Sequence, residues 1–155
     1  HIHSRKMMEY VTPHDEPHVI VSISSDGDVP AKFRTNEHTL GVLRLWFNDI
    51  CDDTMAHIPE DERFKAAAFK REHARQVLDF MAEHAAKAEH FVVHCDAGWC
   101  RSPATAAAIA KIYEGDDSDF FKRYRPNSRV HRMILEEHFC PGGEYGDDHH
   151  RDPSG

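Results

Sequence analysis

The stretch that most constrains the fold is HFVVHCDAGWCRSPATAAAIAK, residues 90–111. It opens with a short apolar run, typical of a buried strand, that ends at Cys95. Five residues then separate Cys95 from Arg101, and an alanine-rich helical segment follows Ser102. A strand, a tight loop and a helix in this order are typical of α/β sheets, whose ligands bind beyond the carboxyl ends of the strands. The sequence therefore places Cys95 and Arg101 at a ligand-binding edge.

The rest of the chain alternates strands and helices in the same way. Apolar runs predict strands at 18–23 and 42–47, and a helical apolar stripe predicts a long helix over 64–89. Ser102 is the predicted N-cap of the helix to Tyr113, and Asn127 or Ser128 that of a last helix. We predict one α/β domain over 18–139, with a central, mainly parallel sheet flanked by helices on both faces. Residues 1–17, in part introduced by cloning, and 140–155 are expected to be flexible.

Composition excludes several classes of protein. The net charge of −8 argues against general nucleic-acid binding, and no apolar run is long enough to span a membrane. The four cysteines of a chain without a signal peptide predict reduced thiols and a cytoplasmic protein. Despite 14 histidines, neither CxxC nor HExxH occurs, so we predict neither a metal site nor a cofactor. The oligomeric state is not predicted.

The loop after Cys95 is suited to binding an anion. A helix N-terminus offers unpaired N–H groups and a positive dipole end, and the main chain of Asp96, Ala97, Gly98, Trp99, Cys100 and Arg101 adds further N–H groups. The small Ala97 and Gly98 allow a tight turn. Arg101 supplies a planar guanidinium that binds two phosphate oxygens at once. We therefore predict a phosphate-binding loop between a strand and a helix N-terminus.

The same positive field activates Cys95. Cysteine thiols at helix N-termini and beside cations ionise far more readily than free thiols, so we predict a nucleophilic Cys95 thiolate. Ser102 is placed to donate a hydrogen bond to this sulfur, and His94 to orient the loop. The negative charge of Asp96 opposes both thiolate and phosphate, so its side chain must point away or meet a cation. Trp99 is expected to pack or to form a pocket wall.

HCDAGWCRS resembles the HCxxGxxRS motif of the cysteine-dependent protein tyrosine phosphatase superfamily, most closely its small dual-specificity and bacterial members. The resemblance extends loosely over residues 18–139. It implies hydrolysis of phosphotyrosine, and also of phosphoserine or phosphothreonine, in proteins or of small phosphomonoesters. Cys95 would form a phosphocysteine intermediate, an aspartic acid on a separate loop would protonate the leaving oxygen, and no metal would take part.

The resemblance places that acid after a strand upstream of the cysteine. LRLWFNDI offers Asp49 in this place, with Asp52 and Asp53 as competitors. The separation of Asp49 and Cys95, 46 residues (95 − 49), is longer than usual for the family by about the length of the 51–63 loop. Downstream, Lys122, Arg123, Arg125 and Arg129 are interpreted as a solvated face, with a substrate-steering rim as the alternative.

Cys100 lies inside the loop, and its side chain has no role in this chemistry. It is either a packing residue or, by resemblance to low-molecular-weight tyrosine phosphatases, a redox partner that traps oxidised Cys95 as a disulfide. Three other functions stay open: a sulfurtransferase of the rhodanese type, a thiol-dependent arsenate reductase, and a phosphate-binding module with weak or no catalysis.

Overall fold

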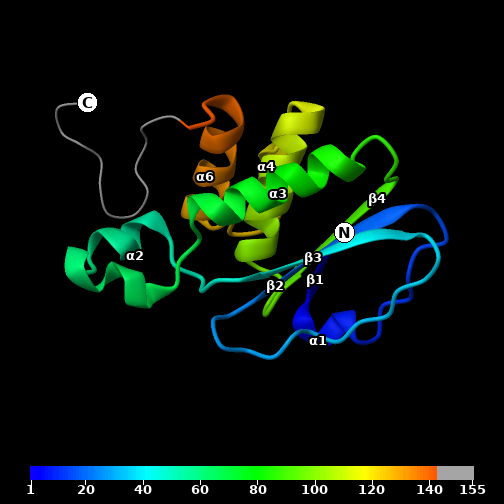
Figure 1. The fold of residues 1–155 in the computed structure, drawn as a ribbon, viewed down its shortest axis with the longest axis horizontal. Coiled ribbons are helices and arrows are strands. Elements are labelled where there is room, and N and C mark those ends of the chain that lie inside the picture. The colour runs from blue at the N-terminus through cyan, green and yellow to red at the C-terminus, as the bar shows by residue number, and fades with distance from the viewer. Residues whose placement is uncertain (143–155) are drawn as a thin grey trace.

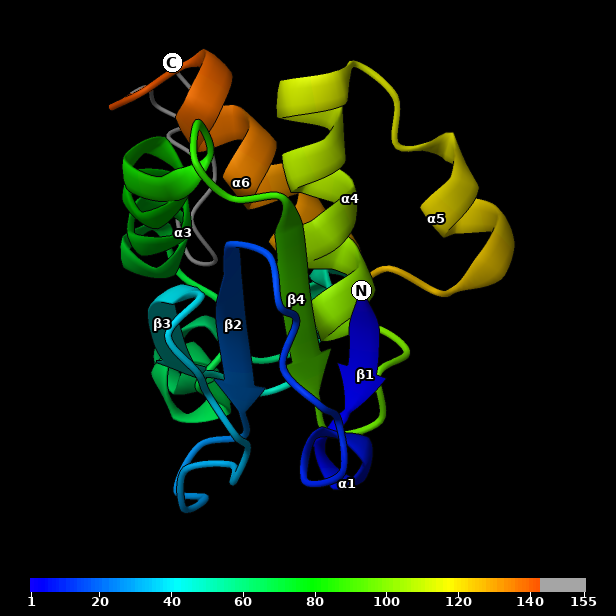
Figure 2. The ribbon, with the colours of Figure 1, turned by 90° about the vertical axis from the view of Figure 1, so that its right-hand side faces the viewer.

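The computed structural model describes residues 1–142 and contains one four-stranded sheet (Figure 1). The strands are β1 (Ile2–Ser4), β2 (His18–Ser24), β3 (Thr39–Trp46) and β4 (His90–Cys95). They run in the order β1-β4-β2-β3, and every neighbouring pair is parallel (Figure 2). The carboxyl ends of all four strands therefore meet at one edge. The predicted parallel α/β architecture is confirmed.

The central strand β2 is buried at every residue, as its run of β-branched and apolar side chains predicts. It is paired on both sides: Val21 lies opposite Leu43 of β3 and Val93 of β4. The observed bounds of β2 and β4 agree with the predicted strands to within a residue.

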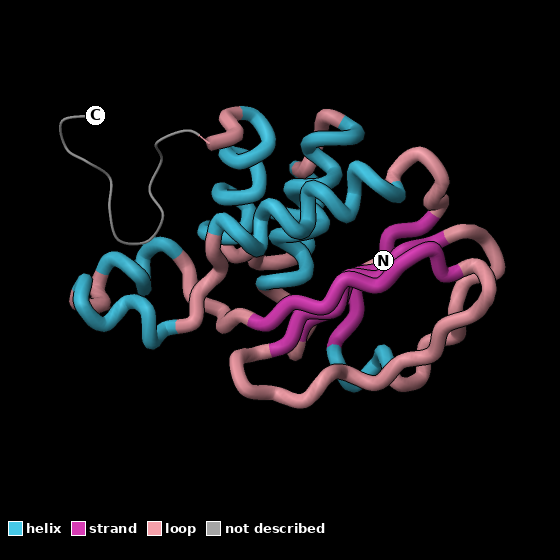
Figure 3. The backbone as a smooth tube through the Cα atoms, in the orientation of Figure 1, coloured by secondary structure: helices cyan, strands magenta, loops and turns pink. Residues whose placement is uncertain are grey.

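Three long helices cover one face of this sheet: α3 (Arg71–His84), α4 (Arg101–Glu114) and α6 (Ser128–Phe139) (Figure 3). Ala104, Ala107 and Ala108 of α4 are fully buried, because small side chains allow α4 to lie close to β4 and α6. The main core lies between these helices and the sheet. Within residues 1–142, no helix combines the length and apolar character needed to cross a membrane.

The opposite face is covered differently from the prediction of helices on both faces. Among residues 1–142, the one helix on that face is the four-residue α1 (Arg5–Met8), and loops cover the rest (Figures 1 and 3). Met8, Val11 and Phe33 form a small apolar cluster with Ile20 and Val92 of the sheet. Loop side chains thus supply the apolar cover that a crossover helix would otherwise give.

The prediction that residues 1–17 lie outside the domain is wrong. Ile2 pairs with Val93 and Ser4 with Cys95, so this segment adds the edge strand β1 beside β4. A three-residue strand is too short to show an alternating pattern, and its main-chain hydrogen bonds leave no trace in side-chain type. Of the predicted flexible tail, only residues 140–142 are described; residues 143–155 lie outside the described part of the chain.

The predicted helix over 64–89 is interrupted. The structure has α2 (Asp52–Ala56), a 3-10 helix η1 (Glu60–Ala66) and then α3 from Arg71. Ala67 ends η1 in the left-handed region, with φ 50°. Asn48 holds this bend with two hydrogen bonds. Its main-chain N–H donates to Ala67 O (2.7 Å), and its side-chain amide donates to Ala66 O (3.0 Å). Both α2 and η1 lie in the chain between Asp49 and Cys95. The last short helix is α5 (Ser118–Arg123).

Candidate active site

Cys95 is the last residue of β4, and α4 begins six residues later at Arg101. The N-cap of α4 is Cys100, which makes no side-chain capping hydrogen bond. The prediction of Ser102 as N-cap is therefore wrong. Pro103 lies in the first turn, where a missing N–H costs no helical hydrogen bond. The uncapped helix end leaves its N–H groups and its positive dipole end directed at the loop.

The Cys95 sulfur is buried and has two polar neighbours. Ser102 Oγ lies 3.1 Å from Cys95 Sγ, and the main-chain N–H of Gly98 donates to the same sulfur at 3.2 Å. Both groups stabilise negative charge on the sulfur. Within residues 1–142, the main-chain N–H groups of Ala97, Trp99, Cys100 and Arg101 form no hydrogen bond. The loop thus keeps a set of N–H donors for an anion placed beside the sulfur.

Gly98 lets this loop lie directly on β1. Its φ is 71°, and a Cβ built on it would lie 2.9 Å from the carbonyl carbon of His3 and 3.0 Å from Ser4 N. These are main-chain atoms that cannot rotate away. On the other side of the contact, Arg5 N–H donates to Asp96 O at 3.1 Å. The edge strand that the sequence did not reveal therefore supports the loop between Cys95 and Arg101.

We expect Gly98→Ala to lower the free energy of unfolding by about 2–5 kcal/mol, the sum of a left-handed backbone penalty and overpacking. Activity should fall with it, because the loop must shift away from β1. Gly115→Ala is the matched control: Gly115 has φ 83° but nothing within 4 Å of the added Cβ. It should lose only the backbone penalty of about 1–2 kcal/mol. Equal losses in chemical denaturation would show that the contact with β1 is unimportant.

Arg101 is buried, and its guanidinium is held by three acceptors. Nη1 donates to Phe47 O (2.8 Å) and Ser25 Oγ (3.0 Å), and Nη2 donates to Asp96 Oδ2 (3.0 Å). Of the five N–H donors of an arginine, the Nε–H and one Nη2–H are left without a partner among the described residues. These two donors lie on one edge of the guanidinium, which is the edge that binds two phosphate oxygens.

Asp96 forms an ion pair with the Arg101 guanidinium, as expected of a carboxylate at this position. Its carboxylate accepts hydrogen bonds from Arg101 and from Ser25 Oγ, the latter at 2.8 Å. Burial opposes ionisation, but these hydrogen bonds and the positive charge of Arg101 outweigh it and hold the pKa of Asp96 below its ordinary value. The carboxylate thus fixes the arginine.

His94 connects the start of the loop to the neighbouring strand. Its Nε2 lies 2.6 Å from Ser22 Oγ on β2, while its buried Nδ1 has no hydrogen-bond partner among residues 1–142. Burial lowers the pKa of His94 to about 4, so the ring is neutral at pH 7. The ring therefore adds no positive charge beside Cys95, and its geometry fits the predicted orienting role.

Of the three candidate acids, Asp49 is the one placed beside the loop. Asn127 Nδ2 donates to Asp49 Oδ1 at 2.7 Å, and the main-chain N–H of Asn127 donates to Cys100 O at 3.0 Å. Asp52 instead forms a two-point ion pair with Arg132, with distances of 2.8 and 2.9 Å. Asp53 is exposed on α2, and its carbonyl oxygen lies 2.8 Å from Nδ1 of the His57 ring.

Cys100 is a free thiol next to Asp49. Burial, the charge of Asp49 and a hydrogen bond to it raise the pKa of Cys100 to about 11, so this thiol is protonated at neutral pH. Its role as redox partner stays a prediction. Trp99 is half-exposed and packs edge-to-face on Tyr124, with ring centroids 6.0 Å apart. The packing role is thus observed, whereas its role as a pocket wall stays a prediction.

The predicted basic cluster is divided by the fold. Arg129 is 1% exposed, and its Nε donates to Phe69 O at 2.9 Å, so it belongs to the interior rather than to a solvated face or rim. Arg123 is exposed on α5 and pairs with Asp119 at 3.4 Å. Sequence reasoning missed three polar residues that hold the site: Ser22, Ser25 and Asn127 as a partner of Asp49. Their only signal was position, at the end of an apolar strand or at a helix N-cap.

Comparisons with known proteins were made at three levels. The chain matches no protein-family profile and no curated protein sequence. Solved structures do match. The human tyrosine phosphatase-like serine/threonine/tyrosine-interacting protein aligns at 15% identity over 80% of this chain and 78% of its own, with a TM-score of 0.52. Tk-PTP in its active form aligns at 18% identity over 86% of each chain, with a TM-score of 0.50.

The chain has the fold of tyrosine-phosphatase-like proteins. The resemblance that rests on HCDAGWCRS is thereby confirmed at the level of the fold. Because these neighbours include a phosphatase-like interacting protein, the fold alone does not separate hydrolysis from binding. The residues of the site carry that distinction.

Proposed function

We propose that this protein is a cysteine-dependent phosphatase that hydrolyses phosphate monoesters, foremost phosphotyrosine and also phosphoserine or phosphothreonine in proteins. One observation carries the proposal: the buried Cys95 sulfur lies between Ser102 Oγ and the Gly98 N–H, at an uncapped helix N-terminus beside Arg101. A nucleophile, anion-binding N–H groups and a guanidinium fork are the parts that phosphoryl transfer to sulfur needs.

In the first step, the Cys95 thiolate attacks phosphorus. The S–P bond forms as the P–O bond to the leaving group breaks, and Asp49 donates its proton to the leaving oxygen. The free Nε–H and Nη2–H of Arg101, with the main-chain N–H groups of the loop, bind the other phosphate oxygens. Asp96 and Phe47 O hold the guanidinium in place, so little reorganisation is needed.

In the second step, water attacks the phosphocysteine. The Asp49 carboxylate accepts a proton from the water, the P–S bond breaks, and inorganic phosphate and the Cys95 thiolate are released. Ser102 is 3.1 Å from the sulfur and donates a hydrogen bond that stabilises the departing thiolate. Asn127 keeps Asp49 in place for both steps.

The position of Trp99 favours a substrate with an aromatic ring. Its indole is 47% exposed and belongs to the loop that binds the phosphate, so an aryl ring attached to that phosphate can pack against it. The edge-to-face contact with Tyr124 limits how far the indole can move.

The test is hydrolysis of 4-nitrophenyl phosphate between pH 5 and pH 8, with and without chelator. We expect turnover that chelator does not reduce, and one phosphate per chain bound covalently to cysteine in protein quenched during turnover. No turnover at any pH in this range would overturn the proposal. Phosphate binding without turnover would identify a binding module, whereas sulfur transfer from thiosulfate or thiol-dependent reduction of arsenate would identify one of the other enzymes.

Asp49→Asn tests the general acid. Hydrolysis of phenyl phosphate, a poor leaving group, should slow by about 10²–10⁴-fold, whereas 4-nitrophenyl phosphate, which needs less protonation, should slow far less. Asp53→Asn, a neighbouring exposed carboxylate without a place at the loop, is the control and should leave both rates unchanged. An equal loss on both substrates would argue that Asp49 is not the acid.

A further inference from the structure

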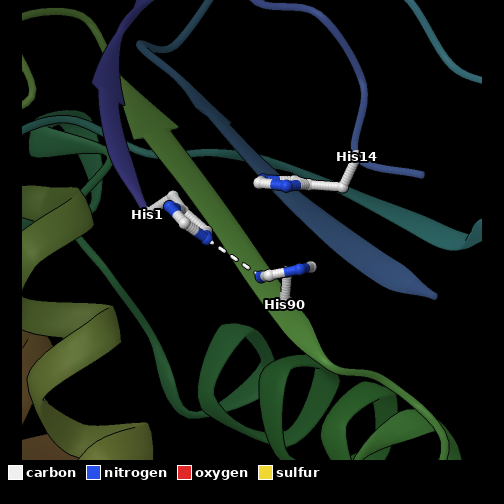
Figure 4. A group of neighbouring side chains, drawn as sticks. All are labelled: His1, His14 and His90. Carbon is white, nitrogen blue, oxygen red and sulfur yellow. Dashed lines mark hydrogen bonds between the residues drawn. The ribbon is translucent and has the colours of Figure 1, made fainter. Parts of the chain in front are cut away.

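Three histidines from distant parts of the chain meet at the end of the sheet opposite the candidate active site (Figure 4). His1 directly precedes β1, His90 is the first residue of β4, and His14 lies in the loop before β2. One ring nitrogen from each lies within 4.8 Å of the others. The three side chains are exposed or half-buried, and none of them takes part in the phosphatase mechanism proposed above.

The spacing of two of the rings already suits metal coordination. His1 Nε2 and His90 Nδ1 face each other at 3.1 Å, as Figure 4 shows. Two ligands of a tetrahedral zinc, each about 2.0–2.1 Å from the metal, are about 3.4 Å apart. The His14 ring stacks on His90, with centroids 4.0 Å apart and planes at 16°. A turn of this partly exposed ring would direct its lone pair to the same point.

The second nitrogen of His90 has the partner that metal-bound histidines usually have. His90 Nε2 lies 3.3 Å from Glu16 Oε1, so the ring can donate its N–H to a carboxylate while Nδ1 faces the metal. His18, which is also nearby, differs: Glu16 O and Thr39 Oγ1 occupy both of its nitrogens, at 2.9 and 2.8 Å. The cluster therefore offers three imidazole ligands and one outer carboxylate.

The main chain holds each of these segments in place. His1 N donates to Phe91 O at 2.8 Å, and its carbonyl oxygen accepts from Val93 N at 2.9 Å. The carbonyl oxygen of His14 accepts from Asn36 Nδ2 at 2.9 Å. The ligands are thus presented by fixed backbone, with only side-chain rotation left to complete the site.

We propose that His1, His14 and His90 bind one divalent transition-metal ion of the kind that prefers imidazole, with zinc as the probe and water as a fourth ligand. Five residue steps of about 3.3 Å separate His90 from Cys95 along β4, so the ion would lie about 16 Å from the reacting sulfur. Its role is structural: it joins the short edge strand β1 and the loop before β2 to β4. The three histidines share no regular sequence spacing, so a motif search could not reveal this cluster.

Zinc binding is tested on metal-free protein by calorimetric titration and by thermal unfolding with and without Zn²⁺. We expect one zinc per chain with a raised unfolding midpoint. His14→Ala and His90→Ala should each raise the dissociation constant for zinc at least about tenfold and remove the rise in unfolding midpoint. Glu16→Gln should raise the dissociation constant about tenfold. His57→Ala is the control, because His57 is an exposed histidine at the end of α2, outside the cluster. This variant should bind zinc as the unchanged protein does.

Unfolding midpoints without zinc check that each variant is folded, and Glu16→Gln keeps the test decisive if a histidine variant is not. Absence of zinc uptake, or equal dissociation constants in all variants, would overturn the proposal. So would binding that Cys95→Ser removes and His14→Ala preserves, since the thiols would then hold the metal.

Discussion

Replacing Cys95 by serine should abolish hydrolysis of phosphate monoesters, with kcat falling by about 10⁵–10⁶-fold, the range seen when a covalent nucleophile is removed. The described neighbours of the sulfur, Ser102 Oγ and the Gly98 N–H, favour an anion that is already formed. Neither group is a base that could take the proton of a serine hydroxyl. His94 is no substitute, because its Nε2 is turned to Ser22.

Cys100→Ser is the matched control for this experiment, since it makes the same change in the same loop. Cys100 has its pKa raised to about 11 by burial and by Asp49, so it is protonated at neutral pH and cannot act as the nucleophile. We expect near-normal turnover by Cys100→Ser, and retained binding of inorganic phosphate by Cys95→Ser. Comparable losses of kcat in the two variants would contradict the assignment of Cys95.

Arg101→Lys should lower kcat/KM by about 10³-fold or more, which is the scale at which an arginine contributes to phosphoryl transfer. The guanidinium does two things at once: three of its N–H donors bond Phe47 O, Ser25 and Asp96, and two remain for phosphate. A lysine ammonium has three donors in total and no planar edge, so it must give up either the anchoring contacts or the substrate.

Steady-state rates on 4-nitrophenyl phosphate, measured together with the free energy of unfolding, check this prediction. Arg101 is buried and its ion pair with Asp96 is partly buried, so some loss of stability is expected. Arg123→Lys is the control, because Arg123 is exposed and its ion pair with Asp119 is a surface pair of little energetic weight. A folded Arg101→Lys protein with normal kcat/KM would show that the guanidinium does not bind the phosphate.

Local pattern was sufficient for much of this protein. The β-branched runs at 18–24 and 90–95 form β2 and β4 because a buried parallel strand requires apolar side chains on both faces. The order of Cys95, Gly98, Arg101 and Ser102 predicted a tight loop between a strand and a helix, and the structure has this loop between β4 and α4, since such geometry depends on neighbours in sequence. Asn127 caps α6 as its residue type predicts, by accepting from Val130 N at 3.1 Å.

Other features depend on contacts between residues far apart in the chain, and there the sequence pattern carried no information. The pairing of Ile2 with Val93 made an edge strand from a polar segment, and the same strand brought His1 to His90. The path of α6 buried Arg129 beneath Phe69 O and turned a predicted helix cap, Asn127, into the partner of Asp49.

The sequence by itself thus determined the class of fold and pointed to Cys95 as the proposed nucleophile. Only the tertiary structure placed Asp49 rather than Asp52 beside the loop, paired Asp96 with Arg101 and assembled the histidine cluster. The physical reason is that periodicity and capping act within one turn or one strand. Hydrogen bonds such as those from Asn127 to Asp49 or from Arg5 to Asp96 join residues 78 and 91 positions apart (127 − 49 and 96 − 5), and such contacts are decided by how the whole chain packs.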